Sequence, residues 1–243
     1  MGFEQFIQFM KQVQGRVGSA FFTSYQSQMN PQHIALLRDL HNELNVEKDF
    51  TTPLDKLNVV VFDLETTGFF PDQGDSILSI GGIKVRGSKI LEDETFYSCV
   101  FHDAQLSSEI KELTGLTDTD VKQAPSLSDV VHEFFGFIQK DTLVAHHAAH
   151  EKGFMQKATW ELYRTQFQHR IVDITFLIRL ADPDLPLQLD DCCERCGIPI
   201  KNRHHALGDA KMTAKLWSIY VEKLQALGYQ TLRDVYEDVA KKT

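Results

Sequence analysis

The sequence predicts an α/β fold in which a mixed five-stranded sheet is flanked by helices and follows an N-terminal helical extension. Three strand-like segments come first, at residues 58–63, 77–85 and 90–100, and the short turn at 86–88 joins the last two as a hairpin. Helical and strand-like segments then alternate, which is the pattern of βα units. Antiparallel strands followed by βα units predict a mixed sheet with helices on its faces.

The elements after residue 100 follow from their hydrophobic periodicity and length. The clearest is an amphipathic helix at 127–138, whose apolar residues recur at helical spacing. The expected short strands are 142–145 and 170–172, and the expected helices are 127–138, 148–163, 173–180, 188–196, 205–224 and 232–239.

Residues 1–55 are predicted to form a helical extension, separate from the main domain at 56–243. Apolar residues recur at helical spacing from Phe3 to Val17. Asn30-Pro31 is typical of a helix start, with an N-cap residue before a proline, and Thr51-Thr52-Pro53 ends that helix. The extension either packs on the main domain or binds a partner or substrate.

Composition and charge argue against two classes of protein, those that coat long nucleic acid and those that span a membrane. The chain has 243 residues, 42% of them hydrophobic, and a net charge of −9, which argues against a protein that coats long nucleic acid. No apolar stretch approaches the ~20 residues of a membrane span. The N-terminus lacks the basic and apolar regions of a signal peptide. We therefore expect a cytoplasmic protein with no membrane association.

The four cysteines leave two interpretations open. Cys192, Cys193 and Cys196 lie on an expected helix that ends at Gly197, and Cys99 is distant from them. Cys193-x-x-Cys196 resembles half of a zinc site or a redox pair, but no second such pair exists. Buried reduced thiols are the favoured interpretation.

Acidic and histidine positions carry the candidate chemistry. Asp63 and Glu65 are two residues apart at the end of the first strand, so their side chains project to the same face. Asp209 lies in the first turns of the helix at 205–224, and His204 lies on the loop before it. Crowded carboxylates repel one another unless cations lie between them, and hard divalent cations suit such oxygen ligands. The pattern indicates metal-assisted phosphoryl chemistry.

With Glu151, these positions form three motifs that resemble the DEDDh group of 3′–5′ exonucleases, the DnaQ-like proofreading family of the DNA polymerase III epsilon type. The similarity covers about residues 57–225, and the motifs agree in order and approximate spacing. The segments 110–117, 123–125 and Val172-Asp173-Ile174 also resemble the family.

The resemblance implies an RNase H-like fold and a 3′–5′ exonuclease that releases nucleoside 5′-monophosphates from single-stranded DNA or RNA. It implies two divalent ions, Mg²⁺ or Mn²⁺, and a polymerase or another protein as a partner of the N-terminal helices. Asp63, Glu65, Asp209 and the second-motif acid would hold the metals, and His204 would take a proton from the attacking water. Thr66 would position the terminal 3′-hydroxyl, and Phe69 would lie against the last base.

The second motif departs from the family pattern Ala-His-Asn-Ala-x-Phe-Asp. Here it reads Ala145-His146-His147-Ala148-Ala149-His150-Glu151, so that Asn, Phe and Asp become His147, His150 and Glu151. Glu151 either completes the metal site or points into solvent on a degenerated site. His146 and His147 are predicted to contact substrate, His147 and His150 could contact substrate or metal-bound water, and a soft-metal site formed by the histidines is the alternative.

Arg203 lies in the basic segment 201–205 and is predicted to contact a substrate phosphate, with ordinary solvated charge as the alternative. A second hypothesis for the whole chain is a non-catalytic nucleic-acid-binding or adaptor module. The four intact positions Asp63, Glu65, His204 and Asp209 favour the enzyme.

Overall fold

The computed structural model describes residues 46–242, with side chains described for 49–241. The helices expected before residue 46 lie outside the described residues. Among residues 46–242, no helix is both long enough and apolar enough to span a bilayer.

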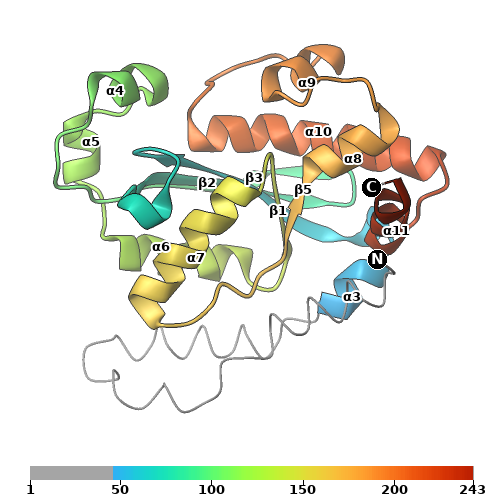
Figure 1. The fold of residues 1–243 in the computed structure, drawn as a ribbon, viewed down its shortest axis with the longest axis horizontal. Helices are drawn as coiled ribbons and strands as arrows, with labels where there is room; N and C mark the ends of the chain where they lie inside the picture. Colours follow the sequence, from blue (N-terminus) through green and yellow to red (C-terminus); the bar gives the residue numbers. More distant parts are fainter. Residues whose placement is uncertain (1–45, 243) are drawn as a thin grey trace.

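A five-stranded mixed sheet forms the centre of the fold, in the order β3-β2-β1-β4-β5 (Figure 1). β1 pairs antiparallel with β2 and parallel with β4, while β3 pairs antiparallel with β2 and β5 parallel with β4. The predicted hairpin and mixed sheet are confirmed. The strands are β1 (Asn58–Thr66), β2 (Ile77–Arg86), β3 (Lys89–Cys99), β4 (Thr142–Ala145) and β5 (Ile171–Asp173).

The helices are α3 (Val46–Thr51), α4 (Ser108–Thr114), α5 (Asp118–Lys122), α6 (Leu127–Ile138), α7 (Ala149–Tyr163), α8 (Ile174–Ala181), α9 (Leu189–Arg195), α10 (Ala206–Ala226) and α11 (Leu232–Lys242), with short 3-10 turns at Leu54–Lys56 and Pro71–Gln73. The helices from α6 onward follow the predicted order and approximate bounds, whereas α4 and α5 were not predicted. The predicted helix at 127–138 has the same bounds as α6.

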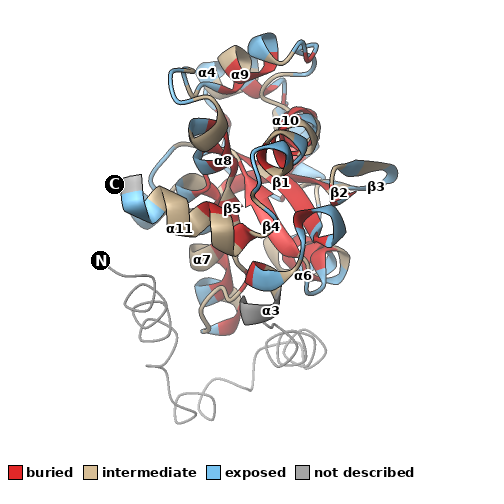
Figure 2. Cartoon of the chain, turned by 90° about the vertical axis from the view of Figure 1, so that its right-hand side faces the viewer, coloured by how far each residue is buried: buried red, intermediate tan, exposed pale blue. Residues whose placement is uncertain are grey.

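The sheet separates two hydrophobic cores, and β1 contributes to both. Val59 and Val61 pack in the core formed with α8, α10 and α11, whereas Val60 and Phe62 pack in the core formed with α6 and α7. Buried residues accordingly gather on the strands and on the helix surfaces that face them (Figure 2). Because side chains alternate along a strand, Asp63 and Glu65 lie on the same side of the sheet as α10.

Two features place α10 against the functional end of β1. The strand runs three residues beyond the expected 58–63, because its pairing with β2 continues to Thr66. Gly81 pairs with Asp63, and a Cβ on Gly81 would come within 2.2 Å of the Leu207 backbone nitrogen. The missing side chain at Gly81 therefore lets the first turn of α10 lie directly on β2, beside Asp63.

Residues 50–57 pack onto the main domain rather than standing apart from it. Phe50 and Leu54 are buried in the core that contains α10 and α11. The Leu54 backbone N–H donates to the Gln230 carbonyl at 2.8 Å, and Pro53 forms a bridge with Thr231. Residues 50–57, the last part of the expected extension and the start of the main domain, thus pack against the C-terminal helix α11 and the residues just before it.

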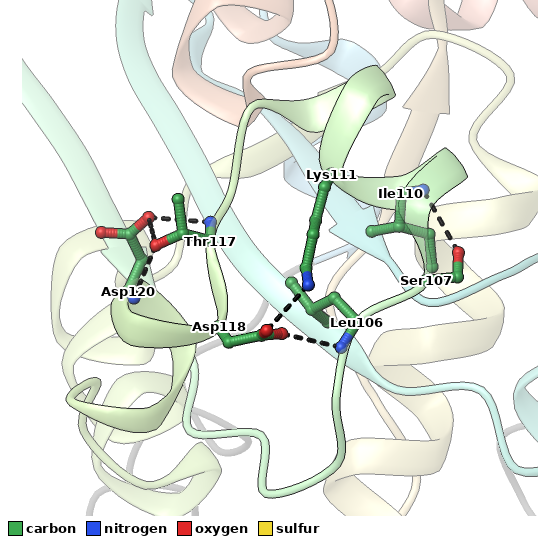
Figure 3. A network of polar contacts seen from close by, with 7 residues as sticks. All are labelled: Leu106, Ser107, Ile110, Lys111, Thr117, Asp118 and Asp120. Carbon is green, nitrogen blue, oxygen red and sulfur yellow. Dashed lines mark hydrogen bonds and ion pairs between the residues drawn. The ribbon is translucent and has the colours of Figure 1, made fainter.

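Helices α4 and α5 lie in the chain between β3 and α6. Polar contacts connect these two helices and cap their first turns (Figure 3). Asp118 accepts hydrogen bonds from the Leu106 backbone N–H at 2.9 Å and from Lys111 Nζ at 2.7 Å. Thr117 and Asp120 form a reciprocal capping box at the start of α5. These local contacts stabilise the segment 110–117 that the sequence singled out.

All four cysteines are free, and Cys192 and Cys193 are fully buried. Burial raises the pKa of Cys192 to about 11 and that of Cys193 to about 12. Both side chains are therefore protonated thiols at neutral pH, which confirms the expectation of buried reduced cysteines on this helix.

Candidate active site

Three carboxylates converge where β1 meets the first turn of α10. One ligand oxygen from each of Asp63, Glu65 and Asp209 lies within 4.8 Å of the others. Glu65 is 8% exposed and Asp209 is 4% exposed. Of the candidate ligand residues, the structure thus brings together the two strand acids and the helix acid that the sequence pattern selected. We call these three residues the acidic cluster.

Burial and mutual repulsion raise the pKa values of the carboxyl groups in the acidic cluster. Burial, followed by the charges of Glu151, Asp209 and Glu65, raises the pKa of Asp63 well above its ordinary value. Burial and then the charge of Asp209 raise the pKa of Glu65 to about 8. Burial raises the pKa of Asp209 to about 6. The raised pKa values mean that the ionised carboxylates are disfavoured at this site. Bound cations would stabilise them.

Glu151 points into the protein beside the acidic cluster. It lies in the first turn of α7 and is 3% exposed, so the solvent-pointing alternative is wrong. Burial is the main cause that raises the pKa of Glu151, and the charges of Asp173 and Glu65 add to it. Glu151 lies outside the 4.8 Å group formed by the other three carboxylates.

Two buried carboxylate oxygens at this site have no hydrogen-bond donor, and this bears on whether divalent cations fit there. Glu151 Oε2 and Asp209 Oδ1 have no hydrogen-bond partner. A buried carboxylate oxygen without a donor is costly unless a cation approaches it. The donor set is oxygen only, which suits Mg²⁺ or Mn²⁺. The residues therefore fit the metal ions that the resemblance implies.

Arg203 forms ion pairs inside the site. Its Nη1 donates to Asp209 Oδ2, and its Nε donates to Asp190 Oδ1 at 2.6 Å. Its charge lowers the pKa of Asp63, Glu65 and Asp209 against the larger effect of burial. Arg203 is thus not a freely solvated charge. Its pairing with Asp190 on α9 could not be predicted from the sequence.

His204 lies on the loop before α10, with a left-handed backbone φ of 58°. Its backbone N–H donates to Asp209 Oδ2 at 3.4 Å, which fixes the loop to the acidic cluster. Burial and the charge of Arg203 lower the pKa of the His204 imidazole. The lowered pKa keeps the imidazole neutral at neutral pH, and a neutral imidazole can accept a proton.

The residue after His204 anchors this loop. His205 is the N-cap of α10, and its ring stacks on Tyr97 with centroids 4.4 Å apart. Tyr97 pairs with Gly81 on β2, which in turn pairs with Asp63. Nothing in the sequence singles out Tyr97, because only the three-strand register places it beside the His204 loop.

Thr66 and Phe69 lie just beyond the acidic cluster, next to α7. The Thr66 hydroxyl donates to the Gly68 carbonyl at 2.7 Å, and its oxygen lies 3.4 Å from His150 Nε2. The Phe69 ring is 76% exposed and meets the His150 ring edge to face, with centroids 5.9 Å apart. An exposed aromatic ring and a hydroxyl group thus lie together beside the carboxylates.

His146 and His147 lie at the end of β4, and their rings meet at 4.5 Å. His147 Nε2 is 3.1 Å from the Leu187 carbonyl oxygen. Burial lowers the pKa of His146 to about 4, and its Nε2 is buried without a partner. Among the described residues, these histidines do not converge into a group of three metal ligands, so the soft-metal alternative gains no support.

A family model described as Exonuclease (RNase_T) matches residues 60–217. Over 167 residues the chain is 33% identical to a DNA polymerase III PolC-type protein of Clostridium perfringens, covering 68% of this chain and 11% of that protein. Over 193 residues it is 32% identical to a DNA polymerase III subunit epsilon-like protein of Rhodobacter capsulatus, covering 78% of this chain and 27% of that protein. The chain thus spans less than a third of the length of these relatives.

Solved structures share the fold. The nuclease domain of 3′hExo, a DEDDh family member bound to rAMP, superposes with a TM-score of 0.60 at 20% identity, covering 70% of this chain and 92% of that one. Exonuclease X in complex with 5′ overhanging duplex DNA gives 0.57 at 20% identity, covering 73% and 98%. These likenesses confirm the predicted RNase H-like fold. With the match across residues 60–217, the predicted exonuclease family is confirmed, and the chain belongs to the exonuclease family.

Proposed function

We propose that the protein hydrolyses phosphodiester bonds at the 3′ ends of single-stranded DNA or RNA, releases nucleoside 5′-monophosphates and depends on divalent metal ions. The convergence of Asp63, Glu65 and Asp209 within 4.8 Å is the observation that carries this proposal. The ion pair of Arg203 with Asp209 offsets only part of the mutual repulsion and burial of three carboxylates this close together.

Two divalent ions, Mg²⁺ or Mn²⁺, would be held by Asp63, Glu65, Asp209 and Glu151. When bound, such ions stabilise the negative charge that develops on the attacking and leaving oxygens of an in-line displacement. Glu151 keeps the carboxylate of the usual Asp on a side chain one methylene longer. Its burial and unpartnered oxygen favour a role in the metal site.

His204 would act as the general base. Its imidazole takes a proton from the attacking water as the new oxygen–phosphorus bond forms. The bond from phosphorus to the 3′-oxygen of the penultimate nucleotide then breaks, and that oxygen takes up a proton. The terminal nucleotide leaves as a 5′-monophosphate. The lowered pKa of His204 supports this role, because the base must be neutral to accept the proton.

The groups beside the acidic cluster would orient the 3′ end. Thr66 would hold the terminal 3′-hydroxyl, and the exposed Phe69 ring would lie against the last base. Arg203 would contact a phosphate once substrate draws it away from Asp209. His146 and His147 are proposed substrate contacts at the neighbouring strand end.

We also propose that the protein acts in DNA replication or repair, because its relatives include proteins named DNA polymerase III. A polymerase or another protein would bind through the N-terminal segment.

The test is hydrolysis of 3′-end- and 5′-end-labelled single-stranded DNA and RNA, with Mg²⁺, with Mn²⁺ and with a chelator. We expect a metal-dependent ladder that shortens from the 3′ end. Asp63→Ala should abolish the ladder while the melting temperature stays that of a folded protein. Binding of the same oligonucleotides without cleavage under either metal would overturn the proposal and favour the adaptor hypothesis.

A further inference from the structure

We infer that His150 reads the 2′-hydroxyl of the terminal nucleotide, so that 3′ ends closed by a ribonucleotide are the preferred substrate class. This inference rests on the proposed function, because it deepens the site that Thr66 and Phe69 form beside the acidic cluster. It assigns a specificity role to a residue that the catalytic scheme above does not use.

The position of His150 follows from the chain on both sides of the cluster. Thr66 directly follows Glu65 on β1, and His150 directly precedes Glu151 on α7. Their side chains meet, with Thr66 Oγ1 3.4 Å from His150 Nε2. The two polar atoms therefore lie beside the carboxylates, where the terminal sugar of a substrate would lie.

The hydrogen-bond roles of the pair are set by Gly68. The Thr66 hydroxyl uses its proton toward the Gly68 carbonyl at 2.7 Å, so its oxygen faces His150 as an acceptor. The contact is a hydrogen bond in the His150 tautomer that carries its proton on Nε2, and Nε2 is then the donor. A separation of 3.4 Å is long for a hydrogen bond, so the contact with Thr66 is weak. Little interaction energy is lost when Nε2–H donates to a substrate oxygen instead.

A ribose presents two neighbouring hydroxyl groups at its 3′ end, and the pair Thr66–His150 presents two neighbouring polar atoms. With the 3′-hydroxyl at Thr66, the adjacent 2′-oxygen is the acceptor that His150 Nε2–H can reach. A deoxyribose lacks that oxygen and leaves the donor with only its long contact to Thr66. The 2′-hydroxyl is the group that distinguishes RNA from DNA at a single nucleotide.

Aromatic neighbours hold the imidazole in this place. The His150 ring meets Phe69 edge to face, and its centroid lies 4.9 Å from that of Phe154. Phe154 is buried in the core beneath α7. The donor therefore sits on a packed support rather than on a free side chain, which is what discrimination by one hydrogen bond requires.

The test compares two RNA oligonucleotides that differ only in the 2′-hydroxyl of the last nucleotide. Both kcat/KM with Mn²⁺ and the dissociation constant with a chelator are measured. We expect the unaltered protein to favour the ribose end by about five- to tenfold in both, the size of one neutral hydrogen bond. His150→Phe should reduce the ratio to about one, and His150→Gln, which keeps an N–H donor, should restore part of it.

His102→Phe is the matched control, since it makes the same exchange on the loop after β3, and it should leave the ratio unchanged. Melting temperatures confirm that each variant folds. A ratio of one in the unaltered protein, or a ratio that His150→Phe leaves intact, overturns the inference. If neither oligonucleotide is hydrolysed, the proposed function fails, and the ratio of dissociation constants still decides the role of His150. If neither is bound, both fail.

Discussion

The guanidinium of Arg203 forms an ion pair with Asp209, one of the three carboxylates of the acidic cluster, and Asp190 on α9 holds it there. Arg203 thus provides the positive charge nearest to a group of buried acids whose pKa values are raised. Divalent cations would have to compete with this guanidinium for Asp209. The same competition would free Arg203 for a substrate phosphate.

Replacement of Arg203 by glutamine should tighten metal binding and weaken oligonucleotide binding. We expect Mn²⁺ to bind about three- to tenfold more tightly, because a half-buried charge pair of about 1 kcal/mol no longer competes. Isothermal titration calorimetry measures this directly. Lys201→Gln, which removes the same charge from an exposed neighbour, is the control. Equal effects of the two substitutions would show that the ion pair with Asp209 is irrelevant.

The stability of the metal-free protein should fall as pH rises from about 4.5 to about 8. The pKa of Glu65 is raised to about 8 and that of Asp209 to about 6, so these two carboxyls bind more protons in the folded state than in the unfolded state in this interval. Stability is therefore fully present below the unfolded pKa values and is lost as pH rises through the folded ones. The lowered pKa values of His146 and His169 oppose this effect only below their ordinary value of 6.5, so the slope is clearest above it. Melting temperatures recorded with a chelator across this interval measure the slope.

Added Mn²⁺ should oppose that slope, with a stabilising effect that grows with pH because metal binding displaces the protons. Glu65→Gln should flatten the pH dependence of the metal-free protein. A melting temperature that rises with pH in the chelator would contradict the pKa directions on which this prediction rests.

Gly81→Ala should destabilise the fold and disturb the acidic cluster together. A Cβ at this position meets the backbone of Leu207 and Ala206 at 2.2 and 2.3 Å, so α10 must move away from β2. We expect a loss of about 1–3 kcal/mol in the free energy of unfolding, together with weaker metal binding. Gly136→Ala is the control, because nothing lies within 4 Å of its Cβ. It should be neutral or slightly stabilising. A Gly81→Ala protein as stable as this control would disprove the close approach of α10.

His204→Ala should lower kcat by about 100-fold or more, the usual contribution of a general base. The KM for an oligonucleotide and the melting temperature should change little, since the side chain of His204 lies on a loop and is only partly buried. Steady-state kinetics with a 3′-labelled oligonucleotide provide the measurement. Retention of more than about a tenth of the activity would remove His204 from the role of base.

Much of the fold could be predicted from the sequence because its signals are local. The run Val59-Val60-Val61-Phe62 predicts a strand buried on both faces, and the structure places its alternate residues in two cores. The periodicity of α6 gave its bounds. The end of β1 was predicted too early, since only its pairing with β2 carries the strand on to Thr66.

The candidate site could be predicted in part. The spacing of Asp63 and Glu65 placed them on one face, and the structure brings Asp209 to them. Three features of the site depend on tertiary contacts and could not be predicted. They are the inward direction of Glu151, the Arg203–Asp190 ion pair and the stacking of His205 on Tyr97. Gly81 was a usable signal, because glycine inside a strand often marks the close approach of another backbone.

Metal binding at the acidic cluster can be tested directly with an anomalous difference map from crystals of the protein soaked in Mn²⁺. We expect a peak coordinated by Asp63, Glu65 and Asp209, with Arg203 withdrawn from Asp209. An active, Mn²⁺-soaked protein with no peak at these three carboxylates would contradict this expectation.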